Sequence, residues 1–423
     1  MTVLDTLRER RSAMVDELRL LVEHESPTGD VHRLDALADV LVEQWERTGA
    51  TTTRHRVDGV GTHLELAWPG PDGTPDDAAP VLLVGHYDTV HDVGTLERNP
   101  WRIDGDGRAW GPGTQDMKSG LVIARHALAH LQAAGRPVQR PVVALLTADE
   151  EVGSLSSSGL IRERARSSAM ALVFEASTSS GALKTARKGV GLWTVTAHGR
   201  AAHAGQHFFD GRNANIALAS IVPTIAALSD EERGTTVNVG IVRGGTRANV
   251  VAARAEAVLD VRFTVPGEAR RVADALTALT TDQGEGERQR AGGRGSQGEG
   301  ERQRAGGRGP DGVTFTLDGG VNRPAMLRTD ATAALFAHAR ACARGLGFDL
   351  EEAAAGGASD GNVTAAEGTP TLDGLGGVGG GLHTDVEWVR VDSLPHRAAL
   401  LAELLSRPAE PTAGQRDAAH GPR

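Results

Sequence analysis

A short apolar run in the first quarter of the chain constrains its fold more than any other feature. Residues 81–84 read VLLV, and such a run without polar side chains is typical of a strand buried on both faces. The run passes through Gly85 into His86 and Asp88. Residues two apart on extended backbone point to the same side, so the imidazole and the carboxylate leave the strand together. Open α/β sheets place ligand chemistry at such ends, although an ordinary strand end is the alternative.

Two further predicted strands in this part of the chain also lead into acidic residues. The predicted strand 142–146 runs into Glu150 and Glu151, and the predicted strand 171–174 ends at Glu175. Strands that alternate with helices indicate parallel pairing through right-handed crossovers. We therefore predict an α/β domain with a central, mostly parallel sheet flanked by helices. The helices predicted from apolar periodicity are 3–23, 31–48, 120–134 and 156–166.

The pattern changes in the middle of the chain, where a second domain begins. At 423 residues the chain exceeds the usual size of one hydrophobic core, so two domains are expected. Between 189 and 325 the order strand, helix, strand, strand, helix indicates a small α+β sandwich with one open sheet face. Helical patterns return at 328–346 and 392–406. We predict that 1–188 and 326–407 form one domain and that 189–325 is an inserted domain.

A tandem repeat lies inside the predicted insertion. The sequence QGEGERQRAGGRG occurs at 283–295 and again at 297–309, with a period of 14 residues. It contains no apolar residue larger than alanine, so it cannot bury enough surface to offset the entropy of ordering. We therefore expect 283–309 to be a disordered insertion and 408–423 to be a disordered tail. A nucleic-acid-binding role is the alternative, but glutamates are interspersed among the arginines.

Charge and cysteine content exclude several classes of protein. The formal net charge is −10, which argues against a protein that binds nucleic acid through phosphate contacts. Cys342 is the only cysteine, so a disulfide framework and a thiolate zinc site are both excluded. We expect Cys342 to be a small buried hydrophobe. No signal-peptide pattern and no apolar run of membrane-spanning length occurs, which predicts a cytoplasmic protein without a membrane partner.

Polar residues at the predicted strand ends and loops form a set suited to metal binding. Histidines and carboxylates without cysteine suit zinc, cobalt or manganese, and this number of them can hold two ions. Each residue also has an ordinary explanation: Asp116 could cap the following helix, and His383 could be structural. Adjacent carboxylates such as Glu150 and Glu151 repel each other unless a charge compensates them, which favours a metal. The set is His86, Asp88, Asp116, Glu150, Glu151, Glu175 and His383.

Together these motifs resemble those of the co-catalytic di-zinc aminoacylase and carboxypeptidase family of metallopeptidases. They are most similar to the glutamate carboxypeptidases of the carboxypeptidase G type. The resemblance implies a zinc-peptidase-like catalytic domain with an inserted lid and dimerisation domain. It covers the chain apart from the repeat and the tail. The matching motifs are Gly85–Val90, Ala109–Gly120, Thr147–Ser154, Glu175–Thr178, Gly199–Gly205 and Gly381–Asp385.

The resemblance implies a centre of two divalent metal ions, with zinc as the expected metal and cobalt or manganese as alternatives. Asp116 would bridge both ions. His86 and Glu175 would complete one metal site, and Glu151 and His383 would complete the other.

The resemblance also assigns roles to residues that do not bind metal. Asp88 would orient a metal-bound imidazole. Glu150 would be the general base that moves a proton from a metal-bridging water to the leaving amine. His203 would stabilise the tetrahedral oxyanion, and Asn249 and Arg323 would hold the terminal carboxylate of the substrate.

Two positions depart from the family pattern. Ala358 stands where the family has a glycine whose backbone meets the substrate, so we expect Ala358 to line the substrate pocket, and the resemblance leaves the fine shape of that pocket open. Met117 stands where many members have a second aspartate. The resemblance still implies the family's cis peptide bond after Asp116.

The hypothesis is a zinc-dependent hydrolase that uses a metal-bridging water to release a C-terminal amino acid, with glutamate as the first candidate, from an N-acyl or peptidyl substrate. One alternative is an N-acyl-amino-acid deacylase that resembles acetylornithine deacetylase, and another is a catalytically inactive metal-binding protein. Glu150 argues against the latter, because a protein that only binds metal needs no base beside a ligand. The expected partners are this small substrate and a second copy of the chain, bound through the inserted domain.

Overall fold

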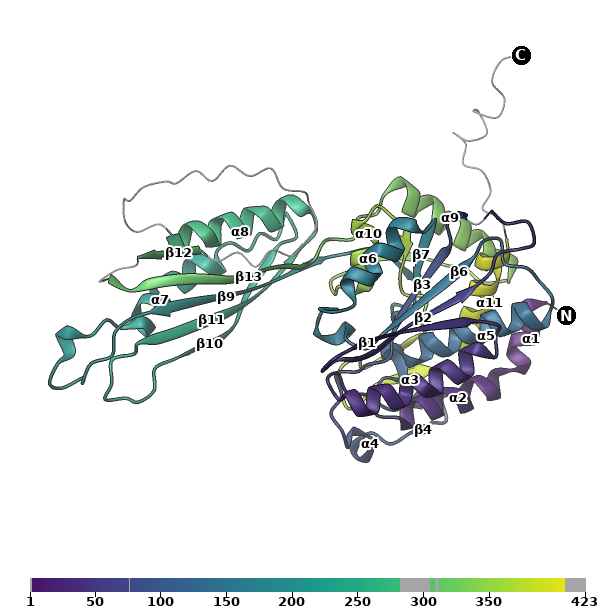
Figure 1. Cartoon of the computed structure of the whole chain (residues 1–423), viewed down its shortest axis with the longest axis horizontal. Coiled ribbons are helices and arrows are strands. Elements are labelled where there is room, and N and C mark those ends of the chain that lie inside the picture. Colours follow the sequence, from purple (N-terminus) through teal and green to yellow (C-terminus); the bar gives the residue numbers. More distant parts are fainter. Residues whose placement is uncertain (1, 76, 282–304, 309–311, 408–423) are drawn as a thin grey trace, which may run out of the picture. The chain divides into compact units, whose positions relative to one another are not determined.

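The computed structural model describes the chain except for residues 1, 76, 282–304, 309–311 and 408–423 (Figure 1). The described residues form two compact units. The smaller unit comprises Arg187–Ala325 together with Gly356–Ala358, and the larger unit comprises the remainder. The sequence predicts an insertion with nearly these ends, but nothing in it indicates that Gly356–Ala358 belongs to the smaller unit.

A six-stranded sheet forms the centre of the larger unit. Its order is β1 (Thr51–Val57), β2 (Gly61–Trp68), β6 (Val142–Thr147), β3 (Val81–His86), β7 (Met170–Val173) and β15 (Thr371–Leu372). The last four strands in this order run parallel, and β1 and β2 join antiparallel at one edge. The predicted α/β class with a mostly parallel sheet is confirmed. β1 is not predicted, because its sequence TTTRHRV is polar and none of its residues is fully buried.

Helices cover both faces of this sheet (Figure 1), and the side chains of β3 show how. Successive residues of a strand point to opposite faces. Val81 and Leu83 pack in the core of one helix group, whereas Leu82 and Val84 pack in the core of the other. The first group is α1 (Val3–Glu9), α2 (Arg11–Glu23), α3 (Val31–Glu46), α5 (Ser119–Ala133), α9 (Asp330–Gly345) and α11 (Ser393–Ser406), and the second is α6 (Ser158–Ser167) and α10 (Asp360–Ala366).

The N-terminal helix differs from its prediction. The sequence predicts one helix over 3–23, but α1 and α2 are separated at Arg10. The backbone N–H of Arg10 bonds to the carbonyl of Leu7, which tightens the last turn of α1 and ends the regular ladder. A short helix, α4 (Thr95–Arg98), also occurs in the larger unit.

A second, four-stranded sheet joins two distant parts of the chain. Its order is β16 (Gly379–Gly380), β17 (Trp388–Arg390), β5 (Arg108–Trp110) and β4 (Arg102–Ile103). β17 pairs antiparallel with β5, so Trp388 lies opposite Trp110, and their ring centroids are 6.3 Å apart. β5 precedes the loop that contains Asp116, and the loop between β16 and β17 contains His383. The pairing therefore brings these two loops together.

The smaller unit contains an antiparallel sheet with helices on one face (Figure 1). Trp193, Val195 and Leu259 point to the helices and are buried, whereas Leu192 on the other face is exposed. This agrees with the predicted sandwich with one open face. The strand order is β10 (Thr236–Gly244), β11 (Arg254–Phe263), β9 (Gly189–His198), β13 (Thr314–Arg323) and β12 (Ala305–Arg308). The helices are α7 (Ala214–Ala226) and α8 (Pro266–Thr281). A separate two-stranded sheet pairs β8 (Leu183–Arg187) with β14 (Glu352–Ala355), and β14 belongs to the larger unit.

β12 corrects one prediction about the repeat. Ala305–Arg308 lies in the second copy, and it pairs with Thr314–Leu317 of β13. The expectation of disorder over 283–309 is therefore wrong for these four residues, because backbone hydrogen bonds can add a strand without apolar side chains. The rest of the repeat, apart from residues 305–308, and the tail 408–423 lie outside the described residues.

Two expectations about composition can be compared with the described residues. Cys342 of α9 is buried, as expected for a small hydrophobe, and burial raises the pKa of its thiol to about 11. None of the helices in the described ranges combines the length and the apolar character needed to cross a membrane.

Candidate metal centre

The ends of three neighbouring parallel strands place four of the predicted site residues. β3 lies between β6 and β7, and His86 at its end is opposite Thr147 of β6. Glu150 and Glu151 lie in a 3-10 turn, η2 (Glu150–Val152), just after β6. Glu175 follows the end of β7. Because parallel strands end at the same edge of the sheet, these side chains converge there.

Asp116 and His383 reach the centre from two loops outside this sheet. Asp116 lies in the irregular turn η1 (Thr114–Lys118), where its backbone has φ −113° and ψ 94°. The Asp116–Met117 peptide bond is cis, as the resemblance implies. Asp116 does not cap α5, which begins at Ser119 without a side-chain cap, so its ordinary explanation is removed. His383 has φ 60°, in the left-handed region, and its side chain is about half exposed.

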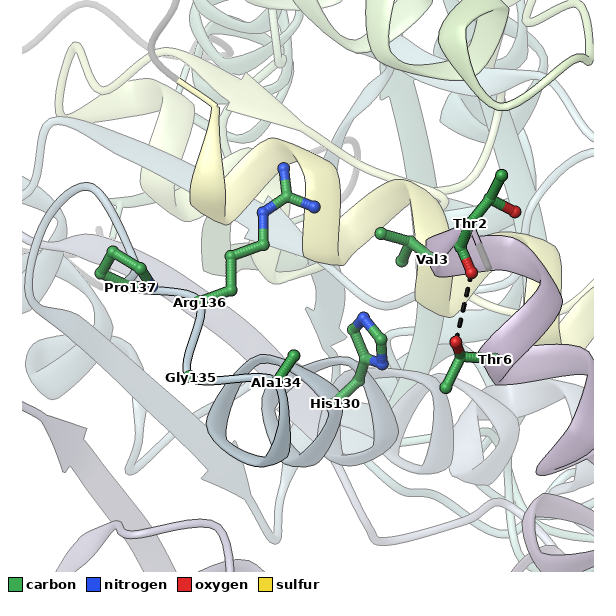
Figure 2. A pocket seen from close by; sticks show the side chains of 8 residues that line it. All are labelled: Thr2, Val3, Thr6, His130, Ala134, Gly135, Arg136 and Pro137. Carbon is green, nitrogen blue, oxygen red and sulfur yellow. Dashed lines mark hydrogen bonds between the residues drawn. The ribbon is translucent and has the colours of Figure 1, made fainter.

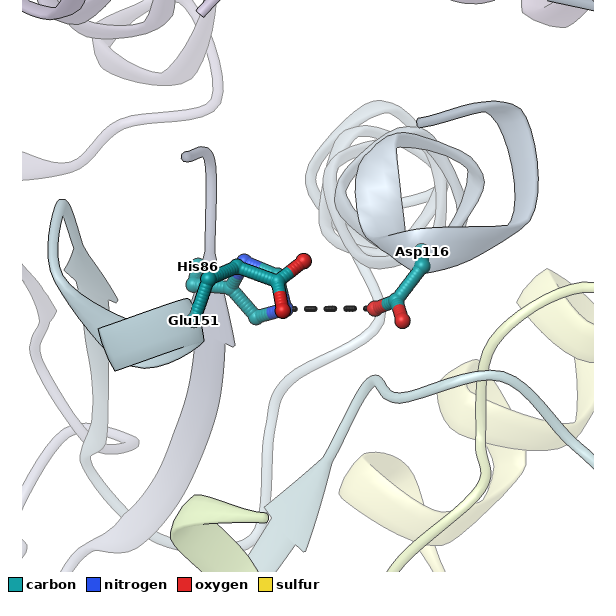
Figure 3. Close-up of side chains that lie close together, drawn as sticks. All are labelled: His86, Asp116 and Glu151. Carbon is teal, nitrogen blue, oxygen red and sulfur yellow. Dashed lines mark ion pairs between the residues drawn. The ribbon is translucent and has the colours of Figure 1, made fainter. Parts of the chain in front are cut away.

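The two carboxylate oxygens of Asp116 face two different histidines. Oδ1 lies 3.3 Å from Nε2 of His86 (Figure 3), and Oδ2 lies 3.0 Å from Nε2 of His383. Nε2 of His86 also lies 3.5 Å from Oε1 of Glu175. Nε2 of His383 lies 3.5 Å from Oε2 of Glu151. The five residues therefore form two groups that share Asp116, and their roles as metal ligands stay predictions.

Unpaired polar atoms at the centre indicate that these residues fit divalent metal ions. Nε2 of His86, Oδ1 of Asp116 and Oε1 of Glu151 are buried and make no hydrogen bond to any described residue. Leaving such an atom unpaired costs about 1–3 kcal/mol. Ligand atoms of these three residues lie within 4.8 Å of one another, as do those of His86, Glu150 and Glu175. Imidazole and carboxylate donors without thiolate suit zinc, cobalt or manganese.

Asp88 contacts both His86 and the turn that contains Glu150 and Glu151, which is more of the centre than its sequence position indicates. Its Oδ1 is 3.3 Å from Nδ1 of His86, and its backbone oxygen is 3.0 Å from the same nitrogen. The carboxylate also accepts the N–H groups of Glu150, at 3.3 Å, and Glu151, at 3.2 Å, and the hydroxyl of Thr28, at 2.8 Å. Asp88 therefore positions both the imidazole and the turn that contains the two glutamates.

Charges within the centre shift the pKa values of its members. Burial alone would lower the pKa of His86, but the surrounding carboxylates, Asp116 first, raise it well above its ordinary value. Burial opposes ionisation of Asp116, yet His383 and His86 bring its pKa far below the ordinary range. Burial and the charge of Asp116 raise the pKa of Glu151 to about 10. Concentrated negative charge of this kind favours a bound cation.

Glu387 contacts the Asp116 loop and is absent from the predicted set. Its side chain is 0% exposed, and it accepts the backbone N–H of Asp116 at 2.9 Å. In the sequence it is one acidic residue near His383, and a glutamate in a loop is ordinarily solvated. Only its burial distinguishes it, and burial is not visible in the sequence.

Of the residues predicted to contact substrate, His203 and Asn249 lie in neighbouring segments of the smaller unit. His203 forms an antiparallel bridge with Val250. The N–H of Ala204 donates to the carbonyl of Asn249 at 3.0 Å. The structure therefore brings together two predicted substrate residues that are far apart in sequence.

Arg323 and Ala358 also belong to the smaller unit. Arg323 is buried at the end of β13. Ala358 follows Gly357, whose carbonyl accepts a hydrogen bond from Nη1 of Arg187 at 3.0 Å. Arg187 is not in the predicted set, because one arginine between two predicted elements gives no signal of its own.

A surface hollow of the larger unit lies at residues other than those of the metal centre (Figure 2). It forms where the start of α1 and the end of α5 meet, and the hydroxyl of Thr6 there donates to the carbonyl of Thr2 at 3.2 Å. His130 and Arg136 are among its lining residues, but no carboxylate is. The hollow therefore lacks the mixed imidazole and carboxylate set that distinguishes the metal centre.

The chain is similar to several known proteins. The chain is 28% identical over 403 residues to carboxypeptidase G2 of Pseudomonas sp. (strain RS-16), which covers 94% of this chain and 89% of that protein. Among solved structures, aminopeptidase PepT from Bacillus cereus has a TM-score of 0.73 at 21% identity and covers 94% of this chain and 98% of its own. The M20 family metallo-carboxypeptidase Sso-CP2 from Sulfolobus solfataricus has a TM-score of 0.68 at 17% identity, with coverage of 93% and 98%.

The structural likeness supports the fold, and the sequence match supports the family. Residues 82–407, well over half of the chain, match peptidase family M20/M25/M40. This range begins in β3 and ends just after α11, so it contains every residue of the metal centre. The chain therefore belongs to peptidase family M20/M25/M40, as its motifs predict.

Proposed function

We propose that this chain is a metal-dependent hydrolase that releases a C-terminal amino acid, with glutamate as the first candidate, from an N-acyl or peptidyl substrate. The observation that supports it most is the position of Asp116 between His86 and His383, with Glu150 beside the same group. The match to carboxypeptidase G2 along most of both chains is the second support.

In this proposal, some residues of the centre bind the metal ions and another transfers a proton. His86 and Glu175 would bind one ion, and Glu151 and His383 would bind the other. Asp116 would bind both ions. Zinc is the first candidate, and cobalt or manganese fit the same donors. Bound ions supply acidity to the attacking water and polarise the scissile carbonyl.

Glu150 is the proton carrier in this proposal. It accepts a proton from the attacking water and later donates it to the leaving nitrogen, which turns a poor leaving group into a free amine. The turn that contains Glu150 is fixed through its own N–H by Asp88, so its carboxylate is held beside His86 and Glu175. A metal-binding protein without catalysis would have no use for this arrangement.

His203 is proposed to donate a hydrogen bond to the developing oxyanion. Its Nδ1 accepts the N–H groups of Gly205, at 3.1 Å, and Gln206, at 3.2 Å. A ring nitrogen that accepts carries no proton, so the neutral imidazole has its proton on Nε2. This tautomer leaves an N–H donor on the exposed ring, which is the group that oxyanion stabilisation requires.

Asn249 and Arg323 are proposed to bind the free carboxylate of the substrate. A guanidinium and an amide suit a carboxylate, and both a C-terminal residue and an N-acyl amino acid present one. An N-acyl-amino-acid deacylase with the same mechanism is therefore the second candidate. Ala358 would narrow the pocket where the family has glycine, and this substitution bears on the choice of substrate.

Homodimerisation through the smaller unit is part of the proposal. β10 is an edge strand of its sheet, and Ile241 and Val242 on it are exposed. Ile216 of the neighbouring helix α7 is exposed as well. An edge strand with apolar side chains is suited to pair with the same strand of a second copy.

A substrate screen tests the proposed function. The purified chain, with and without added zinc or cobalt, is offered dipeptides and N-acyl amino acids, each with a free and an amidated C-terminus, and the released amino acid is quantified. We expect release that requires metal and the free carboxylate. Preference for dipeptides or for N-acyl amino acids separates the two candidates, and a failure to bind stoichiometric metal would exclude both.

A further inference from the structure

We propose that Glu387 is a positioning residue that sets the geometry of the metal centre, an inference that rests on the proposed function. Glu387 is not among the residues whose ligand atoms lie close together at the centre. It acts through the backbone of the loop that contains Asp116, and through the loop that contains His383.

The carboxylate of Glu387 makes a full set of hydrogen bonds. Oε1 accepts the backbone N–H groups of Gln115, at 2.7 Å, and Asp116, at 2.9 Å. Oε2 accepts the backbone N–H of Gly113 at 2.9 Å and lies 2.7 Å from Nε2 of His91. A carboxylate that is 0% exposed is costly to bury, and here four bonds offset that cost.

These bonds fix a backbone that no regular structure holds. Gly113 has φ 70°, and Asp116 has φ −113° and ψ 94°, neither of which belongs to a helix or a continuing ladder. Three amides of one short loop converge on one carboxylate, in the manner of a backbone nest around an anion. Because the N–H of Asp116 is itself one of the three, Glu387 determines the direction in which the Asp116 side chain leaves the chain.

Glu387 also ties this loop to the segment that contains His383. Its backbone carbonyl accepts the N–H of Gly111 at 3.2 Å, and its neighbour Trp388 pairs with Trp110. A Cβ at Gly381 would lie 2.2 Å from the carbonyl oxygen of Val386, so the turn that presents His383 closes tightly just before Glu387. One side chain therefore cross-links the two loops.

The consequence concerns both metal sites. Asp116 must aim one oxygen at His86 and the other at His383, with contacts of 3.3 and 3.0 Å. Because both oxygens belong to one carboxylate, a displacement of the loop would change both contacts at once. Glu387 is thus expected to control metal affinity and coordination geometry while the fold persists.

The test compares Glu387→Gln with a matched control, Glu403→Gln. Glutamine keeps the shape of Glu387 but places an N–H₂ group opposite backbone N–H donors. Glu403 is also a buried glutamate of the larger unit, but it pairs with Arg136, at 2.7 Å, which is not a residue of the centre. The measurements on the full chain are zinc and cobalt affinity by calorimetry, the visible spectrum at saturating cobalt, and kcat and KM.

We expect Glu387→Gln to lose about 10- to 100-fold in metal affinity, as for other residues that orient ligands, and to change the cobalt spectrum at saturation. Its kcat should fall more than its KM rises. Glu403→Gln should keep the affinity and spectrum of the unaltered chain even if it melts earlier. If Glu387→Gln does not fold, His91→Leu, which has no donor, removes one of the four bonds and should lose about 2- to 10-fold in affinity.

The outcomes separate this inference from the proposed function. If the unaltered chain binds two ions and hydrolyses substrate, while Glu387→Gln matches it in affinity and spectrum, the positioning role is wrong and the proposed function stands. Where Glu387→Gln does not fold, unchanged metal affinity and spectrum in His91→Leu have the same meaning. If the unaltered chain binds no metal at all, both are wrong.

Discussion

Nε2 of His383 lies 3.0 Å from Oδ2 of Asp116, although 267 residues separate the two in sequence. The other oxygen of Asp116 faces His86 at 3.3 Å. Asp116 therefore differs from the other predicted ligands, because it is common to both groups.

Replacing Asp116 with Asn should therefore remove both ions, whereas His383→Ala should lower the stoichiometry toward one. The loss of affinity for Asp116→Asn should exceed the roughly 10- to 100-fold typical of residues that only orient a ligand. Metal content after dialysis, measured by atomic absorption, checks this. Equal stoichiometry in the two variants would contradict a shared carboxylate.

Replacing Glu150 with Gln should lower kcat by roughly 10²- to 10⁴-fold, because the amide cannot accept the proton of the attacking water. Both ions should remain bound, since Glu150 is not needed as a ligand in this proposal. Glu151→Gln at the adjacent position is the matched comparison, and it should lose bound metal as well as show a lower kcat. A Glu150→Gln protein with two ions and the full rate would exclude Glu150 as the base.

Metal binding should release protons near pH 7, and apparent affinity should rise with pH. Without metal, the raised pKa of His86 and the pKa of Glu151, about 10, keep both residues protonated at neutral pH. A ligand must lose its proton to bind a cation, so raising the pH favours binding until these groups have titrated. Calorimetry in two buffers of different ionisation enthalpy counts the protons, and a count of zero would show that the shifts are absent.

His203→Ala should lower kcat by about 10²- to 10³-fold with a much smaller change in KM, because an oxyanion donor acts mainly in the transition state. His207, an exposed histidine in the same segment, is the control, and His207→Ala should leave kcat unchanged. Steady-state kinetics with the best substrate of the screen distinguishes the two variants. Equal effects in both would indicate a general disturbance of the segment.

Val242→Lys should convert a dimer to a monomer if β10 pairs between copies. Val242 is 59% exposed on the edge strand, so the change adds a charge to the proposed interface without disturbing the core of the unit. Light scattering coupled to gel filtration measures the mass, and an unaltered Tm should accompany the change. A chain that is already monomeric would contradict dimerisation directly.

The sequence by itself determined the elements that can be recognised from residues adjacent in the chain. The apolar run of β3 has both faces buried, as its composition predicts, and His86 and Asp88 leave it together. Glu151 and Glu175 follow the two parallel strands on either side of β3, as the alternation of strands and helices indicates. The family motifs added Asp116 and His383, which periodicity alone would not have paired.

Only the tertiary structure decided how these pieces meet. β1 has a polar sequence and exists because it pairs with β2, and Ala305–Arg308 becomes a strand because it pairs with β13. The contacts of Glu387 cannot be recognised in the sequence because its three amide partners are more than 250 residues away. The physical reason is that apolar periodicity records which face of an element is buried, whereas the direction of Asp116 depends on hydrogen bonds between segments that only the complete fold brings together.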